Sequence, residues 1–162
     1  MKLSTLIAAG ALLLTTACAA PTIATMSQAT PDSAPIGIPV SAGPTMAQAL
    51  NAARAANGVS TLRHSRKLSA AAMDQARFMA QTGARTHAGQ GGSNPGDRAR
   101  RRGCNWTFIA ENIAWGHQTD SGAMNFWMNS PGHRRNALDS RATLYGTAEY
   151  NRQRVMLVAS RC

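Results

Sequence analysis

The sequence predicts an α+β fold in which helices pack on a small antiparallel sheet. Two alanine-rich segments with apolar residues at helical spacing come first, at 45–58 and 69–83. Two β-rich runs come last, at 142–150 and 155–160, separated by four polar residues, as in an antiparallel hairpin. Helices followed by strands, rather than alternating with them, are typical of α+β domains.

The two N-terminal helices carry their own start and stop signals. Thr45 and Ser69 are good N-cap residues, and Gly58 and Gly83 suit left-handed C-terminal stops. Apolar residues recur along the second helix at helical spacing and are predicted to form its buried face: Ala72, Met73, Ala76, Met79 and Ala80.

The middle of the domain is glycine-rich and then basic, over 86–104. Asn94 followed by Pro95 resembles an N-cap and a first helical position, so a short helix is predicted to run to about Gly103. The β-branched and aromatic residues of 106–112 predict a strand entering the core.

A further helix is predicted over 119–129, with Met124, Trp127 and Met128 as its buried seam. Pro131 cannot continue that helix.

The N-terminus has the composition of an export signal. Lys2 supplies a positive charge, 6–14 is an apolar run too short to span a bilayer, and 15–20 holds small residues. We predict a signal peptide at 1–17, of the lipoprotein type, with Cys18 acylated; the alternative is ordinary cleavage after Ala19.

Residues 18–44 are rich in Pro, Ala and Thr without apolar periodicity, so they are predicted to be a linker. Residues 45–162 then form one domain. The protein is therefore expected to be exported, in the cell envelope or periplasm as a lipoprotein and otherwise secreted. A lipid anchor would be its only attachment to a membrane, and we expect a monomer.

Two cysteines remain once Cys18 is a lipid anchor or lost with the signal peptide. An oxidising compartment favours a Cys104–Cys162 disulfide over two free thiols. By the chain-entropy relation, closing a loop of this length stabilises the fold by roughly 4 kcal/mol.

The chain is strongly basic, with 17 Lys and Arg residues against 7 acidic ones and a net charge of +10. The densest basic run is Arg98, Arg100, Arg101 and Arg102. Such a surface attracts anions, including envelope polymers and lipid headgroups, although it is also compatible with an ordinary solvated face. No nucleic-acid-binding motif accompanies the charge, so nucleic acid is not an expected partner.

Five segments of the domain are informative when taken in order: LNAARAANGVSTL (50–62), LSAAAMDQARFMAQTGARTHAG (68–89), GGSNPGDRARRRGC (91–104), AENIA (110–114) and WMNSPGHRRNAL (127–138). Together they resemble the CAP superfamily of cysteine-rich secretory, antigen 5 and pathogenesis-related proteins, and its bacterial SCP-domain branch in particular. The resemblance implies an α-β-α sandwich with a shallow groove over its sheet. It also implies that His87, Glu111 and His133 meet in that groove.

A second glutamate is common in the family just ahead of the second histidine, but residues 125–129 contain no acid. This departure argues against a mechanism that needs two carboxylates. The resemblance instead implies a site in which His87 and His133, with water, hold zinc or another divalent metal. Glu111 would ligate the metal directly or orient a histidine, and the Pro-Gly turn would aim His133 into the groove.

Three residues of the same segments are expected to support the groove. Asn112 and Arg98 would brace its walls through backbone hydrogen bonds and a buried ion pair. Ser93 would hydrogen-bond within the glycine-rich loop; in the enzymatic alternative it is a nucleophile, with a histidine as base and Glu111 as orienter.

The leading functional hypothesis is an exported, non-enzymatic binding module. Its groove would hold a divalent metal and a lipid or an anionic envelope polymer. One alternative is a hydrolase acting on peptide or peptidoglycan in the same groove. Another is a structural module with no small ligand.

Overall fold

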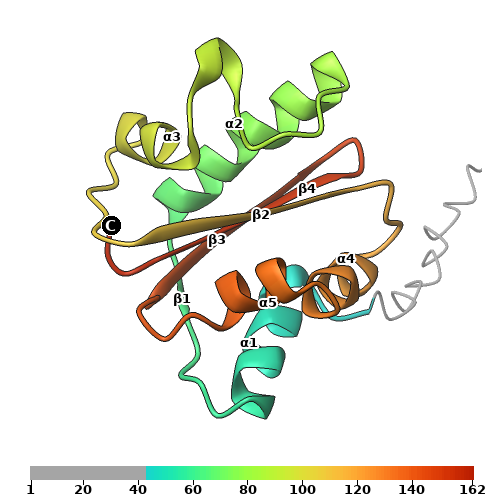
Figure 1. Cartoon of the computed structure of the whole chain (residues 1–162), viewed down its shortest axis with the longest axis vertical. Helices are drawn as coiled ribbons and strands as arrows, with labels where there is room; N and C mark the ends of the chain where they lie inside the picture. Colours follow the sequence, from blue (N-terminus) through green and yellow to red (C-terminus); the bar gives the residue numbers. More distant parts are fainter. Residues whose placement is uncertain (1–42) are drawn as a thin grey trace, which may run out of the picture. The chain divides into compact units, whose positions relative to one another are not determined.

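A four-stranded sheet lies between two layers of helices in the computed structural model, which describes residues 43–162 (Figure 1). One face of the sheet is covered by α2 (Arg66–Thr82) and α3 (Pro95–Arg101). The other face is covered by α1 (Met46–Ala56), α4 (Asp120–Met128) and α5 (Pro131–Leu138). The predicted α+β class and the α-β-α sandwich are both confirmed.

The strand order in the sheet is β1-β3-β4-β2. The strands are β1 (Arg63–His64), β2 (Ile109–Trp115), β3 (Leu144–Tyr150) and β4 (Gln153–Ala159). The predicted hairpin is β3–β4, and β2 pairs antiparallel with β4. The sheet is nevertheless mixed, because β1 pairs parallel with β3. A strand of two residues is too short to show any hydrophobic period, so the sequence did not indicate it.

The hairpin loop is shorter than the four polar residues between the β-rich runs. Only Asn151 and Arg152 form the turn, and both have positive φ, of 47° and 60°. Consecutive left-handed residues are typical of the two-residue turns that suit the twist of a hairpin.

Helix α1 begins as predicted, and α2 begins earlier than predicted. Thr45 accepts a hydrogen bond from the Gln48 backbone in a capping box. In α2 the cap is Ser65, whose hydroxyl accepts from the Leu68 backbone at 3.3 Å, so the prediction of Ser69 as the cap is wrong. The Ser69 hydroxyl instead lies 2.8 Å from the His64 ring.

The segment after α4 is a helix of its own rather than a turn. Pro131 ends α4 as predicted but is also the first residue of α5, where its missing N–H costs nothing. His133 therefore lies in the first turn of a helix, and the Pro-Gly pair begins that helix rather than forming a turn that aims the ring. Helix α3 begins as predicted, with Asn94 and Asp97 in a capping box.

Each side of the sheet has its own hydrophobic core. The core beneath α2 and α3 includes Ala72, Ala76 and Met79 of the predicted face of α2, whereas Met73 and Ala80 of that face are only half-buried. The core on the opposite face includes Met124 and Trp127 of α4. The Trp127 indole N–H is satisfied there, since it donates to the Ile113 carbonyl at 2.9 Å.

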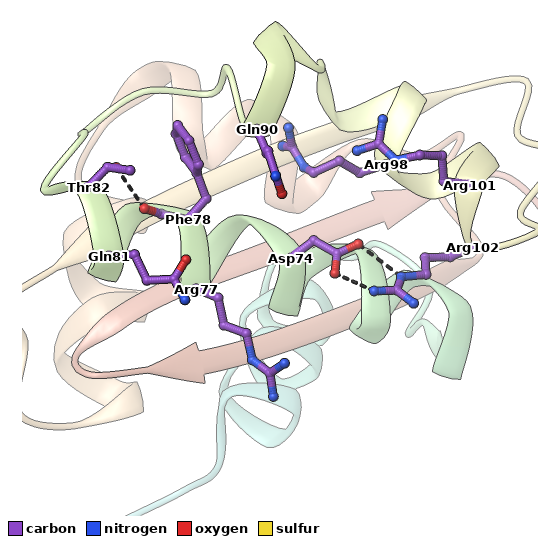
Figure 2. A pocket seen from close by; sticks show the side chains of 9 residues that line it. All are labelled: Asp74, Arg77, Phe78, Gln81, Thr82, Gln90, Arg98, Arg101 and Arg102. Atoms are coloured by element: carbon purple, nitrogen blue, oxygen red, sulfur yellow. Dashed lines mark hydrogen bonds and ion pairs between the residues drawn. The ribbon is translucent and has the colours of Figure 1, made fainter.

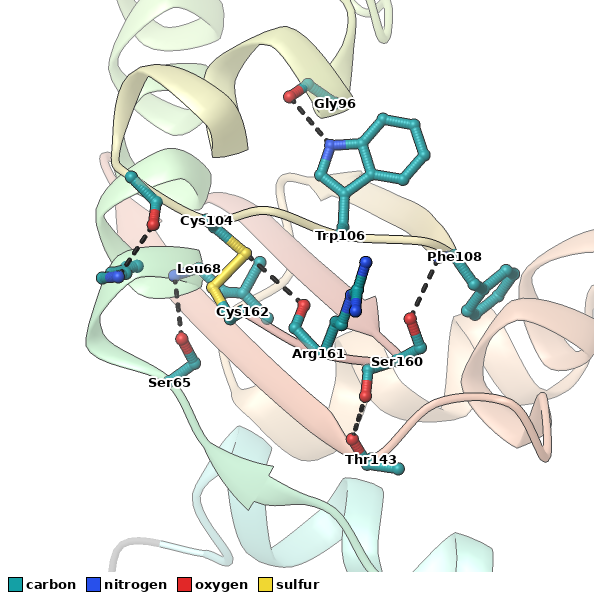
Figure 3. The surroundings of a disulfide bond; sticks show 12 residues. Ser65, Leu68, Gly96, Cys104, Trp106, Phe108, Thr143, Ser160, Arg161 and Cys162 are labelled. Carbon is teal, nitrogen blue, oxygen red and sulfur yellow. Dashed lines mark hydrogen bonds between the residues drawn. A yellow bond between two sulfur atoms is a disulfide. The ribbon is translucent and has the colours of Figure 1, made fainter.

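The predicted disulfide between Cys104 and Cys162 is present and joins the C-terminus to the segment that follows α3 (Figure 3). Next to it, Trp106 donates from Nε1 to the Gly96 carbonyl at 3.1 Å. These contacts hold α3 against the entry to β2, the strand that carries Glu111.

Two predictions concern residues outside the described part of the chain. The signal peptide at 1–17 and acylation of Cys18 both fall there, as does nearly all of the 18–44 linker. Within residues 43–162, no helix combines the length and apolar composition needed to cross a membrane.

Candidate functional site

Glu111 is the centre of the candidate site. It lies in the middle of β2, and its side chain is almost completely buried. Its Oε1 lies 2.9 Å from His87 Nδ1, and its Oε2 lies 2.6 Å from Arg98 Nη2. Both contacts are charge-assisted hydrogen bonds, which are stronger than neutral ones. We call these three side chains the Arg98–Glu111–His87 network.

Arg98 joins this network to the glycine-rich loop before α3. Its side chain is only 1% exposed. Its Nη1 donates to the Ser93 carbonyl at 2.7 Å and to the His87 carbonyl at 3.1 Å. Arg98 therefore makes the predicted backbone hydrogen bonds and buried ion pair, and it fixes both the loop and Glu111 in place.

His133 is held beside the network by α5. Its carbonyl accepts from Asn112 Nδ2 at 2.9 Å, and its ring packs against Phe126 with the centroids 5.6 Å apart. Asn136 donates to Asn112 Oδ1 at 3.0 Å and to the Glu111 carbonyl at 3.3 Å. Two asparagines thus bind the first turns of α5 to β2. His133 Nδ1 is buried and has no hydrogen-bond partner among residues 43–162.

Burial lowers the pKa of His133 below its usual value, and the positive charge of His87 lowers it further. His87 comes from the loop between α2 and α3, and His133 comes from α5. A lowered pKa also keeps the His133 ring neutral at neutral pH, the state in which a histidine can ligate a metal.

The three predicted site residues do not form a ready three-ligand metal centre. Within the described range, no group of three or more His, Cys, Asp or Glu side chains is arranged to hold a metal ion. Both Glu111 oxygens are occupied, one by Arg98 and one by His87. Of the two roles expected for Glu111, the geometry matches orientation of His87 rather than direct ligation.

Ser93 makes neither of the side-chain contacts expected for it. It is buried, and its hydroxyl has no hydrogen-bond partner in the part of the chain that the structure describes. A nucleophile needs a base within hydrogen-bond reach, and no histidine is bonded to this hydroxyl. The residue acts through its backbone, whose carbonyl accepts from Arg98 Nη1 and from the Gly89 N–H at 2.8 Å.

A cavity of about 530 Å³, the His87 groove, opens beside the network. It is lined by His87, Asn94, Pro95, Gly96, Trp106, Ile109, Ala110, Glu111 and Asn136. Trp106 and Ile109 supply apolar surface, and His87 and the two asparagines supply polar groups. Asn136 was not predicted, because an asparagine on a helix has no spacing that distinguishes it from a surface residue. Trp106 is half-buried against the core and also lines the groove.

A three-layer sandwich with a histidine–glutamate pair beside an open groove defines a small SCP-type domain. A sequence model of the cysteine-rich secretory protein (CAP) family matches residues 47–155, and the chain belongs to this family. No sequence among curated proteins is similar enough to count as a match.

Solved bacterial structures share the fold. An extracellular protein containing an SCP domain from Bacillus anthracis matches with a TM-score of 0.69 and 24% identity, over 70% of this chain and 38% of that one. An outer surface protein of Borrelia burgdorferi matches with a TM-score of 0.64 and 19% identity, over 72% of this chain and 90% of that one. A cysteine-rich secretory protein from Staphylococcus aureus matches with a TM-score of 0.60 and 15% identity, over 71% of this chain and 36% of that one. This chain thus spans about a third of the lengths of the first and third.

The lowered pKa of His133 predicts a loss of stability in acid. Below about pH 6.5 the unfolded chain takes up a proton at this histidine before the folded protein does, so the free energy of unfolding falls as the pH drops toward the folded pKa. We expect His133→Gln to reduce the difference in unfolding free energy between about pH 7.5 and about pH 5. Urea unfolding at several pH values measures this difference in unfolding free energy. His64→Gln is the control and should keep the wild-type slope, whereas equal slopes for wild type and His133→Gln would contradict the assignment.

Proposed function

We propose that this CAP domain is an exported, non-enzymatic binding module that holds a divalent metal ion between His87 and His133. The observation that carries the proposal is the Arg98–Glu111–His87 network. A carboxylate that accepts from one ring nitrogen of a histidine fixes the tautomer and orients the other nitrogen for a metal. Arg98 in turn holds the carboxylate, so the orientation is built into the core of the domain.

The remaining donor atoms fit such an ion. With its Nδ1 engaged by Glu111, His87 has Nε2 left for a ligand, and its side chain is 51% exposed. His133 has a buried Nδ1 without a partner among the described residues. Two neutral imidazoles and water suit zinc, which prefers nitrogen and sulfur ligands in tetrahedral sites. Bound there, zinc would supply a Lewis acid; this chain's own residues would supply two imidazole rings, one of them oriented by Glu111.

The adjoining His87 groove is proposed to take a lipid or another small amphipathic component of the envelope. Its volume of about 530 Å³ is in the range of small-molecule sites. Trp106 and Ile109 line it with apolar surface, and His87, Asn94 and Asn136 line it with polar groups. This combination favours a ligand with an apolar body and a polar end.

Export of the chain, with Cys18 as a lipid anchor, is part of the same proposal. The Cys104–Cys162 disulfide supports it, because disulfides persist in oxidising compartments. Two of the similar structures are described as an extracellular protein and an outer surface protein. We propose no catalytic step, because the Ser93 hydroxyl is buried and Glu111 is engaged on both oxygens.

Zinc titration by calorimetry tests the metal claim. Wild-type domain should bind zinc saturably, and His87→Ala and His133→Ala should each weaken binding by about tenfold or more, because each removes a ligand. His64→Ala and His117→Ala remove histidines outside the site and should bind as wild type does. Circular dichroism checks that all four variants fold. Indistinguishable heats for wild type and for both site variants would refute the metal site.

A further inference from the structure

A second cavity, of about 590 Å³, lies between α2 and α3 and takes no part in the proposed metal site. We call it the α2–α3 pocket (Figure 2). Four arginines line it, with a single acidic residue: Arg77, Arg98, Arg101, Arg102 and Asp74. Three of these, Arg98, Arg101 and Arg102, belong to the densest basic run of the sequence, and the metal site accounts only for Arg98.

The ion pairs of the pocket leave an excess of positive charge. Asp74 is already engaged, because Arg102 Nε donates to its Oδ2 at 2.9 Å and Arg102 Nη2 pairs with its Oδ1. Arg98 is neutralised by Glu111. Arg77 packs over the Tyr150 ring, with 5.6 Å between its guanidinium carbon and the ring centroid, and this contact leaves its charge uncompensated.

Arg101 is the second uncompensated cation of the pocket, beside Arg77. It is exposed, and within residues 43–162 its side chain makes no ion pair or hydrogen bond. Figure 2 shows Arg98 and Arg101 along the same side of the pocket, with the Asp74–Arg102 pair below them.

An unsatisfied buried donor gives independent support for a ligand. Arg98 lines the pocket, its side chain is 1% exposed, and its Nε has no hydrogen-bond partner among the described residues. Its other nitrogens are used by the Ser93 and His87 carbonyls and by Glu111. Leaving a charged N–H buried and unpaired is costly, so a donor of this kind favours an acceptor placed in the pocket.

We propose that the α2–α3 pocket binds a phosphate group. A tetrahedral oxyanion accepts hydrogen bonds from several directions, which suits a pocket lined by Arg77 of α2 and by Arg98 and Arg101 of α3. Guanidinium forks pair with phosphate oxygens in bidentate geometry, and arginine is favoured over lysine wherever phosphate is recognised. Fifteen of the seventeen basic residues of this chain are arginines. The phosphate group would belong either to a phospholipid headgroup or to a soluble phosphate or phosphate ester.

Titration with inorganic phosphate, followed by amide chemical shifts at low ionic strength, tests the site. Wild-type domain should show saturable shifts in α2 and α3. Arg101→Gln should weaken binding roughly three- to tenfold, as expected for one lost charge-assisted hydrogen bond at a partly exposed site. Arg135→Gln makes the same charge change on α5, outside the pocket, and should bind phosphate as wild type does.

A variant that is expected to tighten phosphate binding, rather than weaken it, makes the test specific. Asp74→Asn releases Arg102 and removes the carboxylate that competes with the ligand, so it should tighten phosphate binding several-fold. Asp139→Asn is the matched control, because Asp139 also pairs with an arginine, Arg141, but lies outside the pocket. Equal effects of the pocket variants and their controls would mean nonspecific attraction and would overturn the proposal, as would the absence of saturation.

Vesicles distinguish the source of the phosphate. Phosphatidylcholine vesicles containing about one-third phosphatidylglycerol should compete with inorganic phosphate in wild type, but not in Arg101→Gln, if the ligand is a lipid headgroup. Phosphate binding that vesicles leave unchanged would assign the pocket to a soluble phosphate. The His87→Ala/His133→Ala double variant should retain phosphate binding in either case, so this test is independent of the metal site.

Discussion

Replacing Arg98 with methionine should destabilise the domain by roughly 3–5 kcal/mol, the usual cost of leaving one member of a buried ion pair without its partner. The Arg98 and Glu111 side chains are each 1% exposed, so water cannot replace the lost guanidinium. Among residues 43–162, His87 would be the only remaining partner of the carboxylate. The loss would be read as a lower midpoint in urea unfolding, followed by tryptophan fluorescence, to which the buried Trp127 contributes.

The matched control is Arg102→Met, which removes an exposed ion pair from the same helix region. Arg102 pairs with Asp74 where both side chains are partly exposed, at 47% and 29%. Exposed pairs contribute about 0–1 kcal/mol, so this variant should unfold close to wild type. Similar losses in the two variants would contradict the view that Arg98 stabilises the fold through a buried charge.

A double variant separates the charge from the packing. Arg98→Met combined with Glu111→Leu removes both charges, and apolar replacements of a buried pair are often nearly neutral. We therefore expect the double variant to be more stable than Arg98→Met alone. Its recovery will be incomplete, because the Ser93 and His87 carbonyls lose a donor in both variants.

Much of the architecture could be predicted because its signals are local. Thr45, Asn94 and Gly83 mark helix ends through their own side-chain or backbone chemistry, and each is found in that role. The errors have local causes too. Ser65 and Ser69 are both acceptable caps, and the sequence does not say which one the sheet will use. Pro131 both ends one helix and begins the next, and only the end of α4 was predicted.

The residues of the site could be predicted, but the hydrogen bonds and ion pairs that join them could not. His87 and Glu111 are 24 residues apart and lie on different elements, so no spacing relates them, and the family resemblance alone placed them together. That resemblance did not reveal that Glu111 would be shared between His87 and Arg98. The sharing follows from burial, because a carboxylate inside the core must find donors for both oxygens.

Replacing Gly146 with alanine should cost about 3 kcal/mol or more, at the upper end of what overpacking causes. Gly146 lies in β3 directly beneath the first turn of α2. A Cβ at this position would fall within 3.0 Å of Ser69 N, Leu68 C and Leu68 Cβ. Two of these atoms are backbone, so no rotamer change can relieve the clash, and strand and helix would have to separate.

That separation is opposed by hydrogen bonds on both sides of the glycine. The Ser65 N–H donates to the Tyr145 carbonyl at 2.8 Å, and the Thr147 N–H donates to the Ser69 hydroxyl at 3.2 Å. Moving α2 away would break both and open the core beneath Ala72 and Met79. The effect of one methyl group should therefore spread along the whole α2–β3 contact, and thermal unfolding of the purified domain measures it.

The control is Gly132→Ala, the same substitution in the first turn of α5. A Cβ there has no neighbour within 4 Å, so the change should be neutral or stabilise the domain by up to about 1 kcal/mol through helix propensity. Equal melting temperatures for the two variants would contradict the close packing of the α2 backbone against β3 at Gly146. A large loss confined to Gly146→Ala would establish that the close approach of helix backbone to strand backbone requires glycine at this position.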